Sequence, residues 1–113
     1  MTLGISTHIL DTSLGRPAAG VPVALEEKRG AEWVAVGSAE SDADGRVRQL
    51  VPSGRELGDG TLRLRFDVDA YLSREGRTAF FPEVEIVFRF VAGEHYHVPL
   101  LLSPYGYSTY RGS

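Results

Sequence analysis

The alternation of apolar with charged residues, strict in one short run and nearly so in a second, constrains the fold of this chain more than any other feature. In Leu62–Val68 every second residue is apolar and the residues between them are charged. Val84–Phe90 repeats the pattern, and its first face carries Val84, Ile86, Phe88 and Phe90. Because successive side chains of a strand point to opposite faces, each run predicts a strand that rests one face on a core.

Five further runs predict strands, because they are rich in β-branched, apolar and aromatic residues and are bounded by Gly, Pro, Asp and Ser. They are Gly4–Leu10, Val21–Arg29, Trp33–Glu40, His95–Leu102 and Gly106–Tyr110. Gly30-Ala31 predicts a hairpin turn between the second and third of these runs, and Ser103–Tyr105 predicts another between the last two.

One short helix is expected at Asp69–Gly76, where Asp69 can cap the first turn and Gly76 can end the last one. The stretch Ser53–Gly60 predicts a flexible surface loop between strands.

About seven one-sided strands must bury their apolar faces against one another, which favours two packed sheets. We therefore predict an all-β fold, a two-sheet β-sandwich with one short helix. A length of 113 residues and an apolar content of 42% suit one core, so residues 1–113 are expected to form a single domain.

The composition excludes several classes of function. The net charge is only −3 and the basic residues are scattered, so nucleic acid is not an expected partner. No cysteine is present, which excludes disulfides, thiolate metal sites and a cysteine nucleophile. The start lacks a secretion signal and the last residues are not a peroxisomal address, so we expect a soluble, cytoplasmic protein.

Three histidines are the main candidates for chemistry: His8, His95 and His97. His95 and His97 share one face of a predicted strand and would bind a metal only if further ligands came from elsewhere. By pattern alone, His8 is more often a hydrogen-bonded structural residue than a catalyst. Arg46 follows the turn residues Asp44-Gly45 and on its own indicates only the start of a strand.

Motifs for calcium binding, serine-hydrolase chemistry and nucleotide binding are absent from the sequence. The fragment Asp42-Ala43-Asp44-Gly45 lacks the later ligands of a calcium loop, and no nucleophile elbow or phosphate-binding glycine loop occurs. The aromatic end of the chain, with Tyr107, Tyr110 and Arg111, either packs on an edge strand of its own sheet or is covered by a partner subunit. The pattern leaves both alternatives open.

Three segments together resemble the 5-hydroxyisourate hydrolase family, which is related to transthyretin. The first is Ser6–Thr12 with Gly15–Ala18, the second is Asp44–Arg46, and the third is His97–Pro104 continuing into Tyr110–Ser113. The terminal Tyr-Arg-Gly-Ser is the most specific of these marks.

The resemblance implies the transthyretin sandwich, assembled as a homotetramer with a central channel and active sites at the dimer-dimer interface. It also implies an enzyme of urate (purine) degradation, a cyclic amide hydrolase that needs no metal and no cofactor. Water would attack a ring amide carbonyl of 5-hydroxyisourate and give 2-oxo-4-hydroxy-4-carboxy-5-ureidoimidazoline.

By the same resemblance, the catalytic positions are His8, Arg46 and His97, whereas His95 falls outside the catalytic set. We hypothesise that one of the two catalytic histidines is the general base and that Arg46 binds carbonyl oxygens and the developing negative charge. The resemblance assigns substrate binding to the tail residues Tyr110, Arg111, Gly112 and Ser113.

Two other functions remain as alternatives. A carrier of thyroid hormone would share the sandwich and its channel but would have no use for the three catalytic-type residues. A metal hydrolase would use His8, His95 and His97 as ligands and would lose its activity with a chelator.

Overall fold

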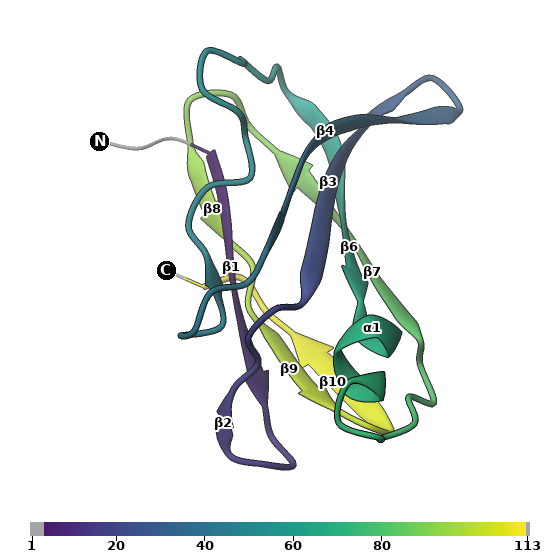
Figure 1. Cartoon of the computed structure of the whole chain (residues 1–113). Coiled ribbons are helices and arrows are strands. Elements are labelled where there is room, and N and C mark those ends of the chain that lie inside the picture. Colours follow the sequence, from purple (N-terminus) through teal and green to yellow (C-terminus); the bar gives the residue numbers. More distant parts are fainter. Residues whose placement is uncertain (1–3, 113) are drawn as a thin grey trace.

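The computed structural model describes residues 4–112, which form two β-sheets and one short helix (Figure 1). The strands are β1 (Gly4–Asp11), β2 (Arg16–Pro17), β3 (Pro22–Arg29), β4 (Glu32–Glu40), β5 (Arg46–Val47), β6 (Gly60–Asp67), β7 (Glu83–Phe90), β8 (His95–His97), β9 (Leu100–Ser103) and β10 (Gly106–Thr109). The helix is α1 (Val68–Ser73). The predicted all-β sandwich with one short helix is confirmed.

Strand β1 is the axis of the first sheet. On one edge it pairs in parallel with β8 and then with β9, and β10 extends the sheet beyond β9. On the other edge it pairs antiparallel with β5 and then with β2. The second sheet is antiparallel and has the order β4-β3-β6-β7. Strands from the start, the middle and the end of the chain therefore meet along β1, and Figure 1 shows β2, β8 and β9 beside it.

The core lies between the two sheets. Ile5, Ile9 and Leu100 of the first sheet and Leu64 and Phe66 of the second are fully buried. Removing one such side chain from water stabilises the fold by roughly 1.5–3 kcal/mol.

The alternating pattern that predicted β6 and β7 is confirmed. Val84 and Phe90 are buried, but Ile86 and Phe88 are only half-buried because β7 is an edge strand. On the opposite face, Val87 is 57% exposed.

The prediction of one unbroken strand at His95–Leu102 is wrong in one respect, because the strand is interrupted at Val98-Pro99. The residues on both sides keep the same register along β1. Proline has no N–H to donate to β1, and the Thr7 hydroxyl donates to the Val98 carbonyl at 2.7 Å. The two-residue strand β2 was not predicted, and β5 was anticipated only as the start of a strand at Arg46.

The helix is confirmed, but its predicted cap is wrong. Strand β6 ends at Asp67, and the Asp67 side chain accepts a hydrogen bond from the Ala70 N–H at 3.0 Å, so the cap is Asp67 and Asp69 lies inside the first turn. Gly76, with a φ of 70°, lies in the turn that follows the helix. No helix within residues 4–112 has the length and apolar character needed to cross a membrane.

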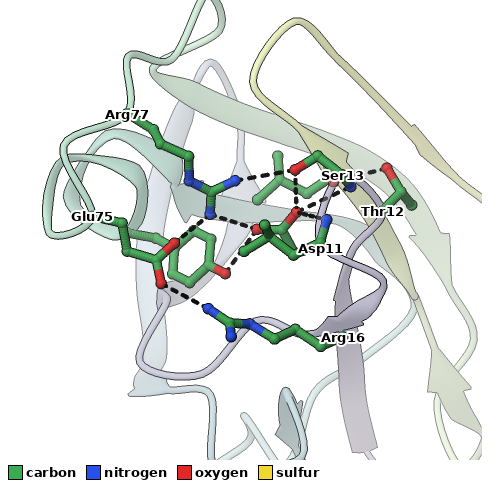
Figure 2. Close-up of polar contacts among 9 residues, drawn as sticks. Asp11, Thr12, Ser13, Arg16, Glu75 and Arg77 are labelled. Carbon is green, nitrogen blue, oxygen red and sulfur yellow. Dashed lines mark hydrogen bonds and ion pairs between the residues drawn. The ribbon is translucent and has the colours of Figure 1, made fainter.

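The Asp11 carboxylate ties the end of β1 to the helix and the turn beyond it, as Figure 2 shows. It is fully buried and accepts hydrogen bonds from the Ser13 hydroxyl at 2.6 Å, the Arg77 guanidinium at 2.7 Å and the Tyr71 hydroxyl at 2.8 Å. Arg77 also contacts Glu75 at 2.5 Å. Buried charges need such partners, so this cluster fixes how the first sheet meets α1.

Candidate active site

The pairing of β1 with β5 and β8 brings the predicted catalytic residues to one face of the first sheet. His8 lies opposite Arg46 across β1 and β5, and Ser6 lies opposite His97 across β1 and β8. Because Ser6 and His8 are two residues apart on one strand, they share a face, and the buried Ile5 and Ile9 occupy the other one. His8, Arg46 and His97 thus lie together on the face of the first sheet that points away from the core.

A tight turn positions Arg46. The Asp42 carboxylate accepts hydrogen bonds from the backbone N–H groups of Asp44 at 2.8 Å and Arg46 at 3.0 Å. The Arg46 N–H is the largest cause that lowers the pKa of Asp42. Gly45 has a φ of 74°, and a Cβ at this position would lie 2.4 Å from the Ile9 carbonyl oxygen. Only glycine therefore lets the turn approach β1 closely enough to set Arg46 beside His8.

His97 is half-buried and lies near Arg46, His8 and His95. Burial lowers the pKa of its imidazole, and the charges of Arg46, His8 and His95 lower it further. A lowered pKa keeps the ring neutral at neutral pH, and a neutral imidazole has one nitrogen free to accept a proton. Nδ1 lies 2.8 Å from the Ser6 hydroxyl oxygen.

The C-terminal tail returns to His97. The Gly112 N–H donates to the His97 carbonyl at 2.8 Å, and a Cβ at Gly112 would lie 2.6 Å from Cδ2 of the His97 ring. The tail backbone therefore rests against the imidazole at a distance that no larger residue allows.

Tyr110 and Arg111 do not line the cavity of about 220 Å³ that His97 lines. They line a separate hollow of about 410 Å³ between β7 and the tail, where the Arg111 guanidinium lies 4.6 Å from the centre of the Tyr96 ring. Tyr110 is 57% exposed. Ser113, the last residue predicted to bind substrate, lies outside the described residues.

Several of these groups line the small cavity of about 220 Å³. Arg46 and His97 line it together with Ser6, Thr7, Val47, Arg48 and His95. His95, which the sequence analysis left outside the catalytic set, is exposed and lies on the same face as His97. Within residues 4–112 no three His, Asp or Glu side chains form a group that could hold a metal ion.

The cavity combines the imidazoles of His97 and His95 with the Arg46 guanidinium, whereas His8, which pairs with Arg46 across the strands, is not among the residues that line it. An imidazole can take a proton from water, and a guanidinium can bind a carbonyl oxygen as it becomes negative. Ser6 was not predicted as a site residue, although its place two residues before His8 predicts that it shares the face of His8.

Comparison with known proteins identifies the family. The model of the HIUase/Transthyretin family matches residues 5–112. A 5-hydroxyisourate hydrolase of Salmonella dublin is 44% identical over 110 residues, which cover 96% of this chain and 80% of that protein.

Two solved structures share the fold. The Klebsiella pneumoniae 5-hydroxyisourate hydrolase has a TM-score of 0.82 and 38% identity, covering 96% of this chain and 98% of that one. Sea bream transthyretin in complex with thyroxine has a TM-score of 0.88 and 31% identity, covering 96% and 93%. The resemblance read from the sequence is confirmed, and the chain belongs to the HIUase/Transthyretin family.

Proposed function

We propose that this chain hydrolyses 5-hydroxyisourate, an intermediate of urate degradation, to 2-oxo-4-hydroxy-4-carboxy-5-ureidoimidazoline. The observation that carries the proposal is the convergence of His8, Arg46 and His97 from three strands onto one face of the sheet. The hydrolases of Salmonella and Klebsiella, with 44% and 38% identity, support the choice of substrate.

The proposed reaction is attack of water on a ring amide carbonyl. His97 is the better candidate for the general base, because its lowered pKa leaves the imidazole neutral and able to accept the proton of the attacking water. Arg46 stays charged and offers a planar fork of donors to the oxygen that becomes negative. His8 lies opposite Arg46 and orients water or substrate.

The tail is proposed to close the site. Gly112 contacts His97 within the chain, whereas Tyr110 and Arg111 border the neighbouring hollow. In this proposal Tyr110, Arg111, Gly112 and Ser113 bind the flat ring of the substrate by ring contact and hydrogen bonds.

Exposed apolar residues support the proposed homotetramer. Phe80, Val87, Tyr107 and Tyr110 are 67%, 57%, 43% and 57% exposed, and Phe81 lies edge-on to Tyr107 with ring centres 5.4 Å apart. Such residues on a small protein are typical of a surface that a partner covers. In this proposal two dimers meet across the face of the first sheet that carries His97, and the active sites lie in that interface.

One core shared by both sheets supports the proposal that residues 1–113 act as one domain. The cytoplasmic location stays a prediction.

A hormone carrier is the alternative that the fold itself favours, since transthyretin of sea bream has the same backbone architecture. Fold similarity does not decide function, whereas the histidines and Arg46 suit hydrolysis of a polar ring.

The deciding experiment follows ultraviolet absorbance while urate oxidase generates 5-hydroxyisourate in place, with and without this protein and with EDTA. Faster decay of the intermediate that survives EDTA is the expected result. Decay at the spontaneous rate would contradict the proposed hydrolase activity and would favour ligand binding on the face of the first sheet that carries His97. Decay that EDTA abolishes would favour the metal hydrolase.

A further inference from the structure

The Ser6 hydroxyl lies between two imidazoles. Its Oγ is 2.8 Å from Nδ1 of His97 and 3.0 Å from Nε2 of His95. The pairing of β1 with β8 produces this geometry, because His97 lies opposite Ser6 and His95 lies opposite Gly4, two residues earlier on the same face. Ser6 is only 9% exposed, so its hydroxyl relies mainly on these two partners.

A hydroxyl group has one proton to donate, so it cannot donate to both rings. In one arrangement Ser6 donates to His95 and accepts from His97, whose Nδ1 then carries the proton. In the other arrangement Ser6 donates to Nδ1 of His97, and the proton of a neutral His97 then sits on Nε2. The direction of the Ser6 hydroxyl therefore sets the tautomer of His97.

The two tautomers differ in what they offer to the substrate. Among residues 4–112, His97 makes its side-chain hydrogen bond through Nδ1 to Ser6, and Nε2 has no partner. Nε2 is thus the nitrogen left for water or substrate. It accepts a proton only in the first arrangement, in which Nδ1 holds the ring proton.

We propose that Ser6 is a positioning residue and that His95, by accepting its hydroxyl proton, holds His97 in the Nδ1–H tautomer with Nε2 free to act as the base. This inference rests on the proposed hydrolase function. His95 thus acts on the base through the Ser6 hydroxyl and does not contact the substrate.

The best test replaces His95 by two residues of similar bulk. In His95→Leu the Ser6 hydroxyl loses its second acceptor and turns to Nδ1 of His97, so the ring proton moves to Nε2. In His95→Gln the side-chain amide oxygen replaces Nε2 of His95 as acceptor. We expect turnover to fall about 10²- to 10⁴-fold in His95→Leu, because a general base contributes that much and the wrong tautomer cannot act as one. His95→Gln should stay within about tenfold of the unaltered enzyme.

Removing the hydroxyl provides an internal control. In Ser6→Ala no group drives the tautomer in either direction, so Ser6→Ala/His95→Leu should hydrolyse faster than His95→Leu alone. Two simple structural defects would add and make the double variant slower.

The direct measurement is ¹⁵N NMR of the imidazole nitrogens in protein labelled at histidine. The chain has only three histidines, and the variants assign His95 by its absence. We expect an Nδ1–H tautomer of His97 in the unaltered protein and in His95→Gln, and an Nε2–H tautomer in His95→Leu. If His97 keeps one tautomer in all variants, the inference is wrong, whatever the activity. If the unaltered protein does not hydrolyse 5-hydroxyisourate, the proposed function fails, and the tautomers still decide the role of Ser6 and His95.

Discussion

The buried Asp11 carboxylate makes a quantitative prediction about stability. Burial alone would raise its pKa, but hydrogen bonds from Arg77, Ser13 and Tyr71 and the charge of Arg77 outweigh burial and lower the pKa from 3.8 to about 2. Since one pKa unit corresponds to about 1.4 kcal/mol, the ionised form contributes about 2 kcal/mol to the folded state.

The sign of the pH dependence follows from the lowered pKa. The contribution of Asp11 is fully present above pH 3.8, the value of an unperturbed carboxyl, and it is lost as the pH falls toward about 2. Asp11→Asn removes the charge and leaves the Arg77 guanidinium with Glu75 as its one acidic partner among residues 4–112, beside its hydrogen bond to the Ser13 hydroxyl. Breaking a buried ion pair in this way costs about 3–5 kcal/mol, and the partial screening of Arg77 favours the lower end, about 3 kcal/mol at pH 7.

The assay is urea denaturation of the unaltered chain and Asp11→Asn at one fixed protein concentration, at pH 7 and at several values down to about 2. The difference in free energy of unfolding should shrink from about 3 to about 1 kcal/mol. Glu32→Gln is the matched control, because Glu32 is exposed, and it should change the stability by less than about 0.5 kcal/mol at every pH. A difference for Asp11→Asn that is independent of pH would refute the reasoning.

Three further predictions concern the proposed active site. Arg46→Lys keeps the charge but loses the planar fork, so turnover should fall about 10²- to 10³-fold while the size of the assembly, measured by light scattering, is unchanged; near-normal turnover would exclude the role of Arg46. Gly112→Ala should lower turnover about 10²-fold, because its Cβ would lie 2.6 Å from the His97 ring, whereas Gly58→Ala, with open space around it, should have no effect. Deleting residues 110–113 should abolish activity and preserve the β-sheet circular dichroism, because the last strand ends at Thr109; loss of that signal would make the tail a structural element.

Most strands were predictable because their signal is local. The alternation in Leu62–Val68 depends only on neighbouring residues, and it predicted the buried face of β6 correctly. The strands β2 and β5 are two residues long and exist because they pair with β1. No local pattern reveals β2, and only the turn before Arg46 indicated the start of β5. The cap of α1 was misplaced by two residues because Asp67 and Asp69 are equally good caps, and the end of β6 decides between them.

The site was predictable as a set of residues but not as an arrangement. The resemblance supplied His8, Arg46 and His97, whereas only the pairing of β5 and β8 with β1 explains how positions so far apart in the sequence meet. The role of Ser6 depends on two hydrogen bonds across strands, and His95 was set aside because the resemblance gave it no match.

The backbone alone does not distinguish a hydrolase from a carrier, since the solved structures of both share it. The distinction therefore depends on the side chains on the outer face of the first sheet. A site for a largely apolar ligand gains from apolar walls, and each unpaired polar group in it weakens binding. The face between β5 and β8 instead carries a guanidinium and imidazoles, and one of those imidazoles has a lowered pKa. A histidine with a lowered pKa beside a guanidinium in one hollow is what acid-base chemistry needs and what a carrier has no reason to keep. Changes of single side chains on this face therefore test function, whereas changes in the core test only the fold that both functions share.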